Sequence, residues 1–171
     1  QTLLSIVADQ REELLANDYS ELCPRPEESQ LDLKSNRAQV VIGVRRCGKS
    51  TLCEMFLMQS GIKFAYVNFD DDRMEEMKAG DLDRLLETLY MTYGDFKYLF
   101  LDEIQNVKGW PLFVNRLLRQ KIHLFITGSN SKLLSKELST HLTGRNNKVE
   151  LYPFSFSEYC TMKKIDTASQ S

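Results

Sequence analysis

The chain has 171 residues, of which 42% are hydrophobic and 27% charged, and its formal net charge is -2. This length and balance predict one soluble globular domain, with room for a fragment of a second. The net charge does not support a protein that coats nucleic acid, although a local basic patch, and with it a role linked to nucleic acid, stays open. No apolar run reaches the roughly 20 residues that span a membrane, so we expect no membrane partner.

The N-terminus and the cysteines bear on where the protein works. Residues 3–7 are too short for a signal peptide and follow no basic residues. The chain begins at Gln1, so we expect that the natural start is missing. The four cysteines form no C-x-x-C pair and have no histidine at ligand spacing, which argues against a zinc site and a disulfide framework. Reduced thiols in a cytoplasmic protein are the expectation.

Residues 1–36 precede the first predicted strand of the core. Apolar residues within 2–16 recur at helical spacing, which predicts a helix that packs on the core. Two prolines in residues 23–29 predict a loop, because proline cannot take part in regular backbone pairing. We therefore interpret residues 1–36 as a helix and a loop packed on the following domain.

Residues 37–160 alternate between strand-like and helix-like patterns. Runs rich in β-branched and aromatic residues predict strands at 38–42, 64–69, 98–103, 122–126 and 148–151. Helical spacing occupies the intervals between them, with Asp81 as an N-cap, Pro111 near a helix start and a capping box at 155–158 before a last helix at Tyr159. This alternation predicts a three-layer α/β fold, a P-loop NTPase domain with a mainly parallel five-stranded sheet. Residues 161–171 then begin a truncated C-terminal region.

The strand at 38–42 runs directly into a phosphate-binding loop motif. Residues 43–50 read GVRRCGKS and match the pattern G-x-x-x-x-G-K-[ST] at every fixed position. Strand, loop and helix in this order place a phosphate at a helix N-terminus. We predict that Lys49 neutralises phosphate charge and that Ser50 offers its hydroxyl to Mg²⁺. The nucleotide-binding residues predicted here are Gly43, Val44, Arg45, Arg46, Cys47, Gly48, Lys49, Ser50 and Thr51.

Two features near this motif leave alternatives open. Cys47 lies inside the loop, close to a predicted helix N-terminus; a redox switch is one interpretation and a tolerated variable position is the other. Residues 70–72 are three consecutive aspartates at a predicted strand end, interpreted either as solvated acids or as a metal site.

Three polar stretches follow predicted strands and therefore meet at one edge of a parallel sheet, where ligands of such sheets bind. Asp102 closes an apolar strand in the form of a Walker B acid, which holds Mg²⁺. Glu103 is interpreted as the carboxylate that orients or deprotonates the attacking water, with a solvated strand-end acid as the alternative. Ser129 or Asn130, after the next strand, is expected to contact the γ-phosphate or that water.

Other polar and aromatic residues carry weaker signals. Arg145 lies in a predicted loop and is a candidate for stabilising charge on the transferred phosphoryl group, with a solvated arginine as the alternative. His123 is interpreted as a strand residue with a satisfied hydrogen bond, and Trp110 as a packing residue rather than an interface anchor.

The absence of a guanine-specific motif from the sequence predicts which nucleotide is bound. GTP specificity requires an N-K-x-D stretch, and the nearest approach, residues 147–150, ends in glutamate. ATP is therefore the expected nucleotide, bound with Mg²⁺. A small-molecule kinase does not need the Asp-Glu pair that ends a strand, and this layout fits hydrolysis.

The segments GVRRCGKST, YVNFDDDR, YLFLDEIQNVKGW, LFITGSNSKLLS, HLTGR and ELYPFSFSEY together resemble a group of predicted bacterial and archaeal ATPases of the AAA superfamily, over about residues 39–159. The resemblance implies an extra strand between the phosphate-loop and Walker B strands, and a catalytic glutamate at Glu103. It also implies a sensor residue at Ser129 or Asn130 and a catalytic arginine at Arg145. Relatives of this kind continue into a C-terminal domain that looks related to nuclease folds.

Two functions of different class remain at this point. One is an ATPase whose turnover drives a missing C-terminal effector domain. The other is a nucleotide-dependent switch or binding module in which hydrolysis is slow or absent and nucleic acid is a conceivable partner. A homo-oligomer is compatible with either function.

Overall fold

The computed structural model describes residues 2–20, 25–45, 47–129 and 131–153, with the side chains of residues 131–133 not described. Several sequence predictions therefore lie outside the described residues: those for Arg46, Asn130, Cys23, Cys160, the capping box at 155–158, the helix from Tyr159 and the region 161–171.

The domain is built on one sheet in which every described strand pair is parallel. Its strands are β1 (Ala38–Ile42), β2 (Ala65–Asn68), β3 (Tyr98–Asp102), β4 (His123–Gly128) and β5 (Asn146–Glu150), in the order β2-β3-β4-β1-β5. β4 lies between β1 and β3, as the resemblance implies. The predicted α/β fold with a parallel five-stranded sheet is confirmed.

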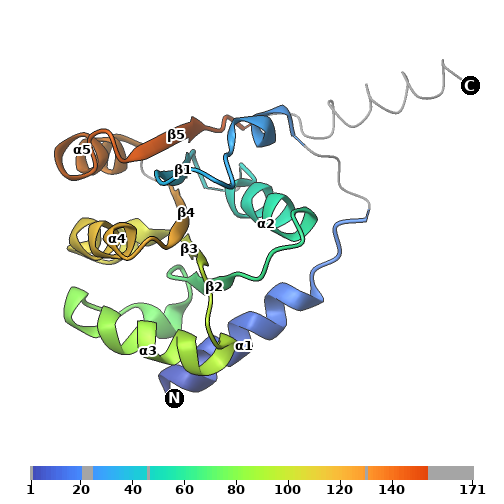
Figure 1. The fold of residues 1–171 in the computed structure, drawn as a ribbon, viewed down its shortest axis with the longest axis vertical. Helices are drawn as coiled ribbons and strands as arrows, with labels where there is room; N and C mark the ends of the chain where they lie inside the picture. Colours follow the sequence, from blue (N-terminus) through green and yellow to red (C-terminus); the bar gives the residue numbers. More distant parts are fainter. Residues whose placement is uncertain (1, 21–24, 46, 130, 154–171) are drawn as a thin grey trace, which may run out of the picture.

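Helices cover both faces of the sheet (Figure 1). α3 (Leu82–Tyr93), α4 (Trp110–Arg119) and α5 (Ser131–His141) lie on one face, and α2 (Lys49–Gln59) lies on the other. α1 (Leu3–Ala16) lies beside the edge strand β2 and contacts α3. The arrangement is the three-layer architecture predicted from the alternating pattern.

The core divides into two clusters because strand side chains alternate between the faces of the sheet. Val40 and Ile42 of β1 belong to the cluster under α3, α4 and α5, whereas Val41 belongs to the cluster under α2. All five residues of β1 are buried, which explains why the strand reads as a continuous apolar run apart from Gln39. Burial on both faces fixes the register of the central strands and so the place where each one ends.

The N-terminal helix is tied to the sheet edge by a buried amide. The Gln10 side chain, 1% exposed, donates from Nε2 to the Asn68 carbonyl (3.0 Å) and accepts from the Asn68 N–H (3.0 Å). β2 is an edge strand, so this amide satisfies backbone groups that have no strand partner on that side. α1 thus packs on the core as predicted, and it also caps the open edge.

Several predicted boundaries differ from the structure. β5 begins at Asn146, two residues before the predicted start, and α2 begins at Lys49, inside the phosphate-loop motif. Asp81 occupies the N-cap position of α3, as predicted, but its side chain makes no capping hydrogen bond to that helix. Its backbone is helical (φ -89°, ψ -9°) because it closes the short 3₁₀ turn Ala79–Asp81, and its carboxylate accepts the Lys78 N–H (3.1 Å) of that turn instead.

Candidate functional site

The phosphate-loop motif follows β1 and leads into α2, as its context predicts. Gly48 has φ of +93°, a left-handed conformation that only glycine adopts without strain. A Cβ on Gly43 would lie 2.4 Å from the Leu151 carbonyl oxygen, so a side chain at this position would clash with backbone. The first N–H groups of α2 have no partner within the helix and, with the helix dipole, favour an anion at this end.

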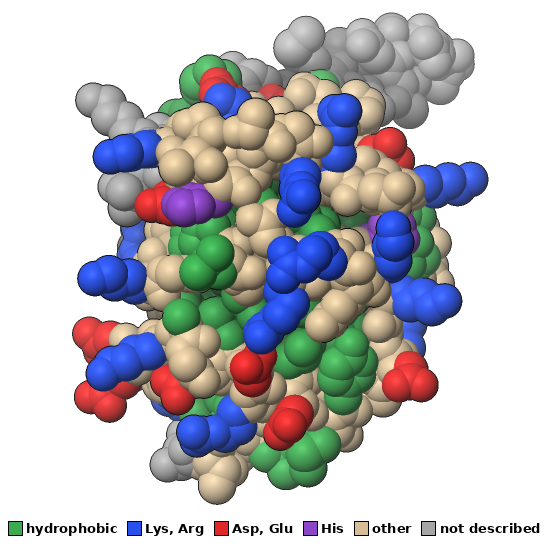
Figure 2. Space-filling view, turned by 60° about the vertical axis from the view of Figure 1, so that its left-hand side comes forward, with side chains coloured by type: hydrophobic (Ala, Val, Ile, Leu, Met, Phe, Trp, Pro, Cys, Tyr) green, Lys and Arg blue, Asp and Glu red, His purple; other side chains and the backbone are tan. Residues whose placement is uncertain are grey.

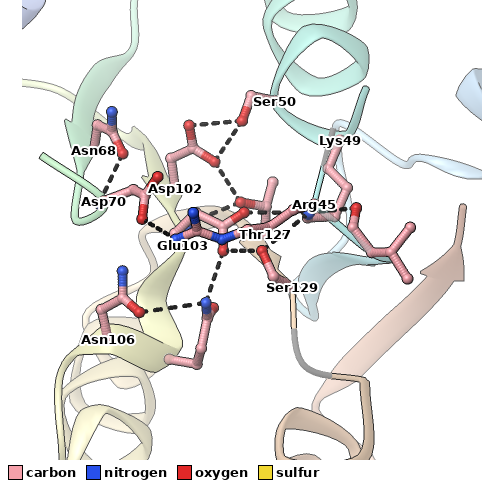
Figure 3. Close-up of polar contacts among 12 residues, drawn as sticks. Arg45, Lys49, Ser50, Asn68, Asp70, Asp102, Glu103, Asn106, Thr127 and Ser129 are labelled. Carbon is pink, nitrogen blue, oxygen red and sulfur yellow. Dashed lines mark hydrogen bonds and ion pairs between the residues drawn. The ribbon is translucent and has the colours of Figure 1, made fainter. Parts of the chain in front are cut away.

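Lys49 is the cation at the centre of the site (Figure 3). It is 4% exposed, and its Nζ donates to the Val44 carbonyl (3.1 Å) and to Ser129 Oγ (3.3 Å). The same Nζ lies 3.2 Å from Glu103 Oε1. Lys49 therefore joins the phosphate loop to the ends of β3 and β4, which the sequence predicted to converge.

Asp102, the Walker B acid, is paired with Ser50 of the loop. Both carboxylate oxygens of Asp102 lie 2.7 Å from Ser50 Oγ, and Thr127 Oγ1 and the Tyr66 hydroxyl (3.3 Å) also donate to the carboxylate. Burial raises the pKa of Asp102 above its ordinary value, although the hydrogen bonds from Thr127 and Ser50 counteract part of this effect. The two residues predicted to hold a metal are therefore in direct contact.

Glu103 turns away from the strand into the same space. Its backbone is left-handed (φ 57°, ψ 48°), an unusual conformation for a residue with a side chain. Its N–H donates to Thr127 Oγ1 (2.9 Å), while Oε2 accepts from Ser129 Oγ and from Gln105 Nε2 (2.7 Å). Burial raises the pKa of Glu103, but the hydrogen bonds from Ser129 and Gln105 and the Lys49 charge outweigh it, so the pKa lies below its ordinary value.

A cavity of about 400 Å³ opens between these groups. Its lining residues come from the loop, from the start of α2 and from the ends of β2 and β3: Arg45, Gly48, Lys49, Ser50, Thr51, Asn68, Asp70, Asp102 and Glu103. The buried lysine and the helix N-terminus suit phosphate, and the hydroxyl and carboxylate oxygens of the Ser50–Asp102 pair are ligands that Mg²⁺ prefers. The residues present therefore fit a magnesium-bound phosphate chain.

The three aspartates after β2 do not form a metal site. Among the described residues, no group of three His, Cys, Asp or Glu side chains is placed to hold a metal ion. Asp70 pairs with Arg45 of the loop (2.5 Å) across the mouth of the cavity, and Asp71 pairs with Arg73 (2.7 Å). The interpretation of 70–72 as merely solvated acids is also incomplete, since two of the three fix local structure.

Arg145 is not brought to this cavity within one chain. It immediately precedes β5, whereas the phosphate loop follows β1, and these two strands run parallel with Ala38 opposite Asn146. Arg145 therefore lies at the amino edge of the sheet, about 15 Å away along a strand of five residues. It is exposed, and its Nη1 donates to Asn115 Oδ1 of α4 (3.1 Å).

The surroundings of Arg145 are basic and open. A hollow of about 350 Å³ beside it is lined also by Arg116 and Arg119 of α4. Figure 2 shows Lys and Arg side chains gathered across the middle of this face, over the helices on the side of the sheet away from α2.

Four residues of the site escaped sequence reasoning. Thr127, with no exposed area, contacts both acids, and Gln105 holds Glu103. Tyr66 reaches Asp102 from inside β2, and Arg25 reaches the phosphate loop from the N-terminal segment. Thr127 carried a usable signal, as a polar residue at the end of an apolar strand. Gln105 lies two residues from Glu103, and this spacing alone does not predict their contact. Tyr66 and Arg25 have partners distant in the chain, which their local patterns do not indicate.

Trp110 and His123 follow their simpler interpretations. Trp110 is 3% exposed and belongs to the core, and Pro111 lies in the first turn of α4 as predicted. His123 Nδ1 lies 3.0 Å from the Ser35 carbonyl, so its ring is hydrogen-bonded. Cys47 is buried and unpaired with another cysteine. None of the helices in the described part of the chain is long and apolar enough to cross a membrane.

Comparison with known proteins agrees with this geometry. Residues 35–160 match the family model AAA_14, described as an AAA domain. An uncharacterized protein of Methanocaldococcus jannaschii is 41% identical over 142 residues, which cover 80% of this chain and 31% of that protein. An uncharacterized protein of Haemophilus influenzae is 38% identical over 140 residues, covering 77% and 35%. The chain thus spans about a third of the length of these relatives.

A solved structure shares the fold. The Walker-type ATPase PABY2304 of Pyrococcus abyssi superposes with a TM-score of 0.52 at 17% identity, over 89% of this chain and 59% of that one. Its likeness concerns the fold, while the family match rests on sequence over most of the chain. With the phosphate loop, the Ser50–Asp102 pair and Glu103 assembled at one edge of a parallel sheet, the chain belongs to the AAA domain family, as a nucleotide-binding P-loop module of the AAA superfamily.

Proposed function

We propose that this module binds Mg·ATP and hydrolyses it. The observation that carries the proposal is the placement of Glu103, a buried carboxylate between Lys49 and Ser129 and next to the Ser50–Asp102 pair. Mg²⁺, when bound, would neutralise charge that develops on the phosphate oxygens. The stretch at 147–150 lacks the final aspartate of a guanine-specific motif, which supports ATP as the nucleotide.

One set of protein groups binds the phosphates and the metal, and another positions and deprotonates the attacking water. The first N–H groups of α2 and the Lys49 ammonium bind phosphate oxygens, and Ser50 with Asp102 holds the metal. Glu103 orients the attacking water and accepts its proton, while Ser129 holds the carboxylate in place. Glu103 is ionised at neutral pH, as a proton acceptor must be, although its lowered pKa also makes it a weaker base while these contacts are in place.

The test is Glu103→Gln, which keeps the shape of the side chain but removes its capacity to accept a proton. Lys49, Ser50 and Asp102 stay intact, so ATP affinity should be kept while phosphate release falls by about 10²–10⁴, as is typical of general-base contributions. Glu87→Gln, at an exposed position of α3, is the matched control. Equal release by the Glu103 variant and the wild type would remove Glu103 from the mechanism. Loss of binding would mean instead that Glu103 belongs to the metal site.

A nucleotide-dependent switch with slow hydrolysis is the second candidate, and a specific observation favours it. In this structure, donors on Lys49, Ser129 and Gln105 all engage the Glu103 carboxylate. A carboxylate held in this way must exchange some of these contacts before it can accept a proton from water. The Glu103→Gln measurement separates the candidates, because a switch would show little release in the wild type and no further fall in the variant.

We also propose that Arg145 acts across an interface between two copies of the chain. Its exposed position at the amino edge of the sheet supports action on the nucleotide of a neighbouring subunit, because the side chain is too distant from the cavity of its own. This proposal includes a homo-oligomer, in which the basic face of one copy approaches the nucleotide site of the next. Asn115, the present partner of Arg145, would release it on assembly.

The chain covers only about a third of the length of its relatives. We propose that nucleotide turnover drives an effector domain C-terminal to residue 160. The net charge of -2 does not favour nucleic acid as the partner of this module. The basic face beside Arg145 is compatible with such a partner, which a nucleic-acid binding assay would test.

A further inference from the structure

A buried arginine from the N-terminal segment contacts the phosphate loop from behind. Arg25, 6% exposed, precedes the 3₁₀ turn Pro26–Gln30. Its Nη1 donates to the Cys47 carbonyl (2.6 Å), and its Nη2 donates to the Tyr152 carbonyl (3.0 Å). Its Nε lies 3.6 Å from Glu27 Oε2. One guanidinium therefore links three segments that lie far apart in the sequence.

The contact has a consequence for the direction of a loop N–H group. In a trans peptide the C=O and the following N–H point in opposite directions. The Cys47 carbonyl is bound by Arg25, so the Gly48 N–H points away from Arg25. Gly48 lines the cavity that Lys49, Ser50 and Asp102 also line. The guanidinium thus orients one donor of the phosphate-binding backbone without touching the phosphate.

Such an external restraint is needed because Gly48 is a glycine. Its left-handed conformation lets the loop wrap tightly, but the lack of a side chain also lets the preceding peptide rotate at little steric cost. A rotated peptide would aim the Cys47 carbonyl, with its partial negative charge, at the phosphate. A charged hydrogen bond of 2.6 Å from a buried donor opposes this rotation, since breaking it would leave the guanidinium without that acceptor inside the protein.

We infer that Arg25 is a positioning residue for the phosphate site, which holds the peptide between Cys47 and Gly48 in its anion-binding orientation. The inference rests on the proposed binding of nucleotide phosphates. Through the Tyr152 carbonyl, Arg25 also joins the loop to the chain that leaves β5, where the Leu151 N–H already donates to the Ile42 carbonyl (2.7 Å). The loop is therefore held on the side opposite its ligand by the segments that precede and follow the sheet.

The experiment compares Arg25→Ala with Arg37→Ala, an exposed arginine that immediately precedes β1, in the full protein. ATP and ADP affinity are measured by calorimetry below the melting temperature of each variant. Arg25→Ala should weaken both nucleotides about tenfold, which corresponds to about 1.4 kcal/mol. Millimolar guanidinium, far below denaturing concentrations, should restore much of the loss in this variant, and equal concentrations of NaCl should not.

A second readout follows the peptide itself. The amide resonance of Gly48 should shift strongly when ADP binds to the wild type, lose much of that shift in Arg25→Ala and regain it with guanidinium. If Arg25→Ala does not fold, Arg25→Lys serves instead, because one ammonium replaces the two-armed guanidinium and should give an intermediate loss of affinity.

The outcomes separate this inference from the proposed function. Unchanged affinity in Arg25→Ala, with a loss in Lys49→Ala, would overturn the role of Arg25 and leave phosphate binding intact. A loss of affinity that guanidinium does not restore, with an unchanged Gly48 shift, would reduce Arg25 to a general structural residue. No ATP binding by the wild type would overturn the proposed function and the inference together.

Discussion

The two edges of the same sheet are built in opposite ways. At the carboxyl edge, Lys49, Asp102 and Thr127 are each at most 4% exposed and are joined through a continuous set of polar contacts. At the amino edge, Arg145 is exposed and its guanidinium bonds to Asn115, an exchangeable surface contact. Both edges carry charged groups predicted to act on ATP.

The contrast shows two ways to place a charge. Buried polar groups must be paired, because an unpaired one costs the full desolvation penalty, so the carboxyl edge is rigid and its donors are already aimed. An exposed arginine stays hydrated and can exchange its partner at little cost. The carboxyl edge is therefore suited to hold a ligand, whereas the amino edge is suited to meet one that a second molecule brings. Four variants test this contrast in binding and folding, from the largest expected effect to the smallest.

Lys49→Ala should weaken ATP binding by tenfold or more. The variant removes the central cation of the rigid edge, and charge-assisted contacts contribute roughly 1.5–3 kcal/mol each. The measurement is titration calorimetry with Mg·ATP, with the exposed Lys136→Ala of α5 as the charge-matched control. Equal affinity in the Lys49 variant and the wild type would contradict the assignment of this edge as a phosphate site.

Thr127→Val should lower the stability of the fold. The change conserves shape, but it leaves the buried Glu103 N–H without its acceptor and removes one of the donors to the buried Asp102 carboxylate. An unsatisfied buried group costs about 1–3 kcal/mol, so we expect a melting temperature lower by roughly 2–10 °C. Thr92→Val on α3, where the hydroxyl bonds to its own helix, should change little. A melting temperature within a degree of the wild type would mean that the carboxyl edge is not a cooperative network.

Asp71→Asn tests an ion pair of intermediate exposure. Hydrogen bonds from Arg73 hold the pKa of Asp71 well below its ordinary value. The pair therefore stabilises the fold above the unfolded pKa of about 3.9, and this contribution is lost as the pH falls through the lowered pKa. Near pH 7 the variant should melt about 2–4 °C below the wild type, a gap that should persist to about pH 4 and narrow below it. A constant gap down to the most acidic pH would exclude the ionised pair as its cause.

Arg145→Ala should leave the melting temperature within about 1–2 °C of the wild type, because an exposed arginine contributes little to folding. Phosphate release should nevertheless fall, and release by the wild type should rise steeply with protein concentration if the arginine acts between subunits. Arg119→Ala, on the same face, is the control for loss of surface charge. Unchanged turnover in the Arg145 variant would leave this residue as an ordinary solvated arginine.

The sequence allowed the fold and the centre of the site to be predicted in advance. β1 is found at the predicted residues, and the other four strands differ by one or two residues at their ends. Burial on both faces makes the central strands β1, β3 and β4 recognisable apolar runs, whereas the edge strand β5 has a single buried residue. The contact between Ser50 and Asp102 and that between Ser129 and Glu103 follow from the rule that parallel strands end at one edge. Arg25 was missed because its partners are distant in the chain. Thr127 stands in the polar stretch after the fourth predicted strand but received no role, and the spacing of Gln105 to Glu103 does not by itself predict their contact.

By itself, the sequence determined in which order strands and helices follow, and it predicted which residues are candidates for binding phosphate and metal. Local patterns suffice for this, since glycine spacing, helix periodicity and apolar runs each act within a few residues. Only the tertiary structure decided that Arg145 lies at the edge opposite the cavity and that Arg25 lies behind the phosphate loop. Those positions depend on which strands become neighbours and on how a long N-terminal segment returns to the sheet, and both are set by packing summed over the whole domain.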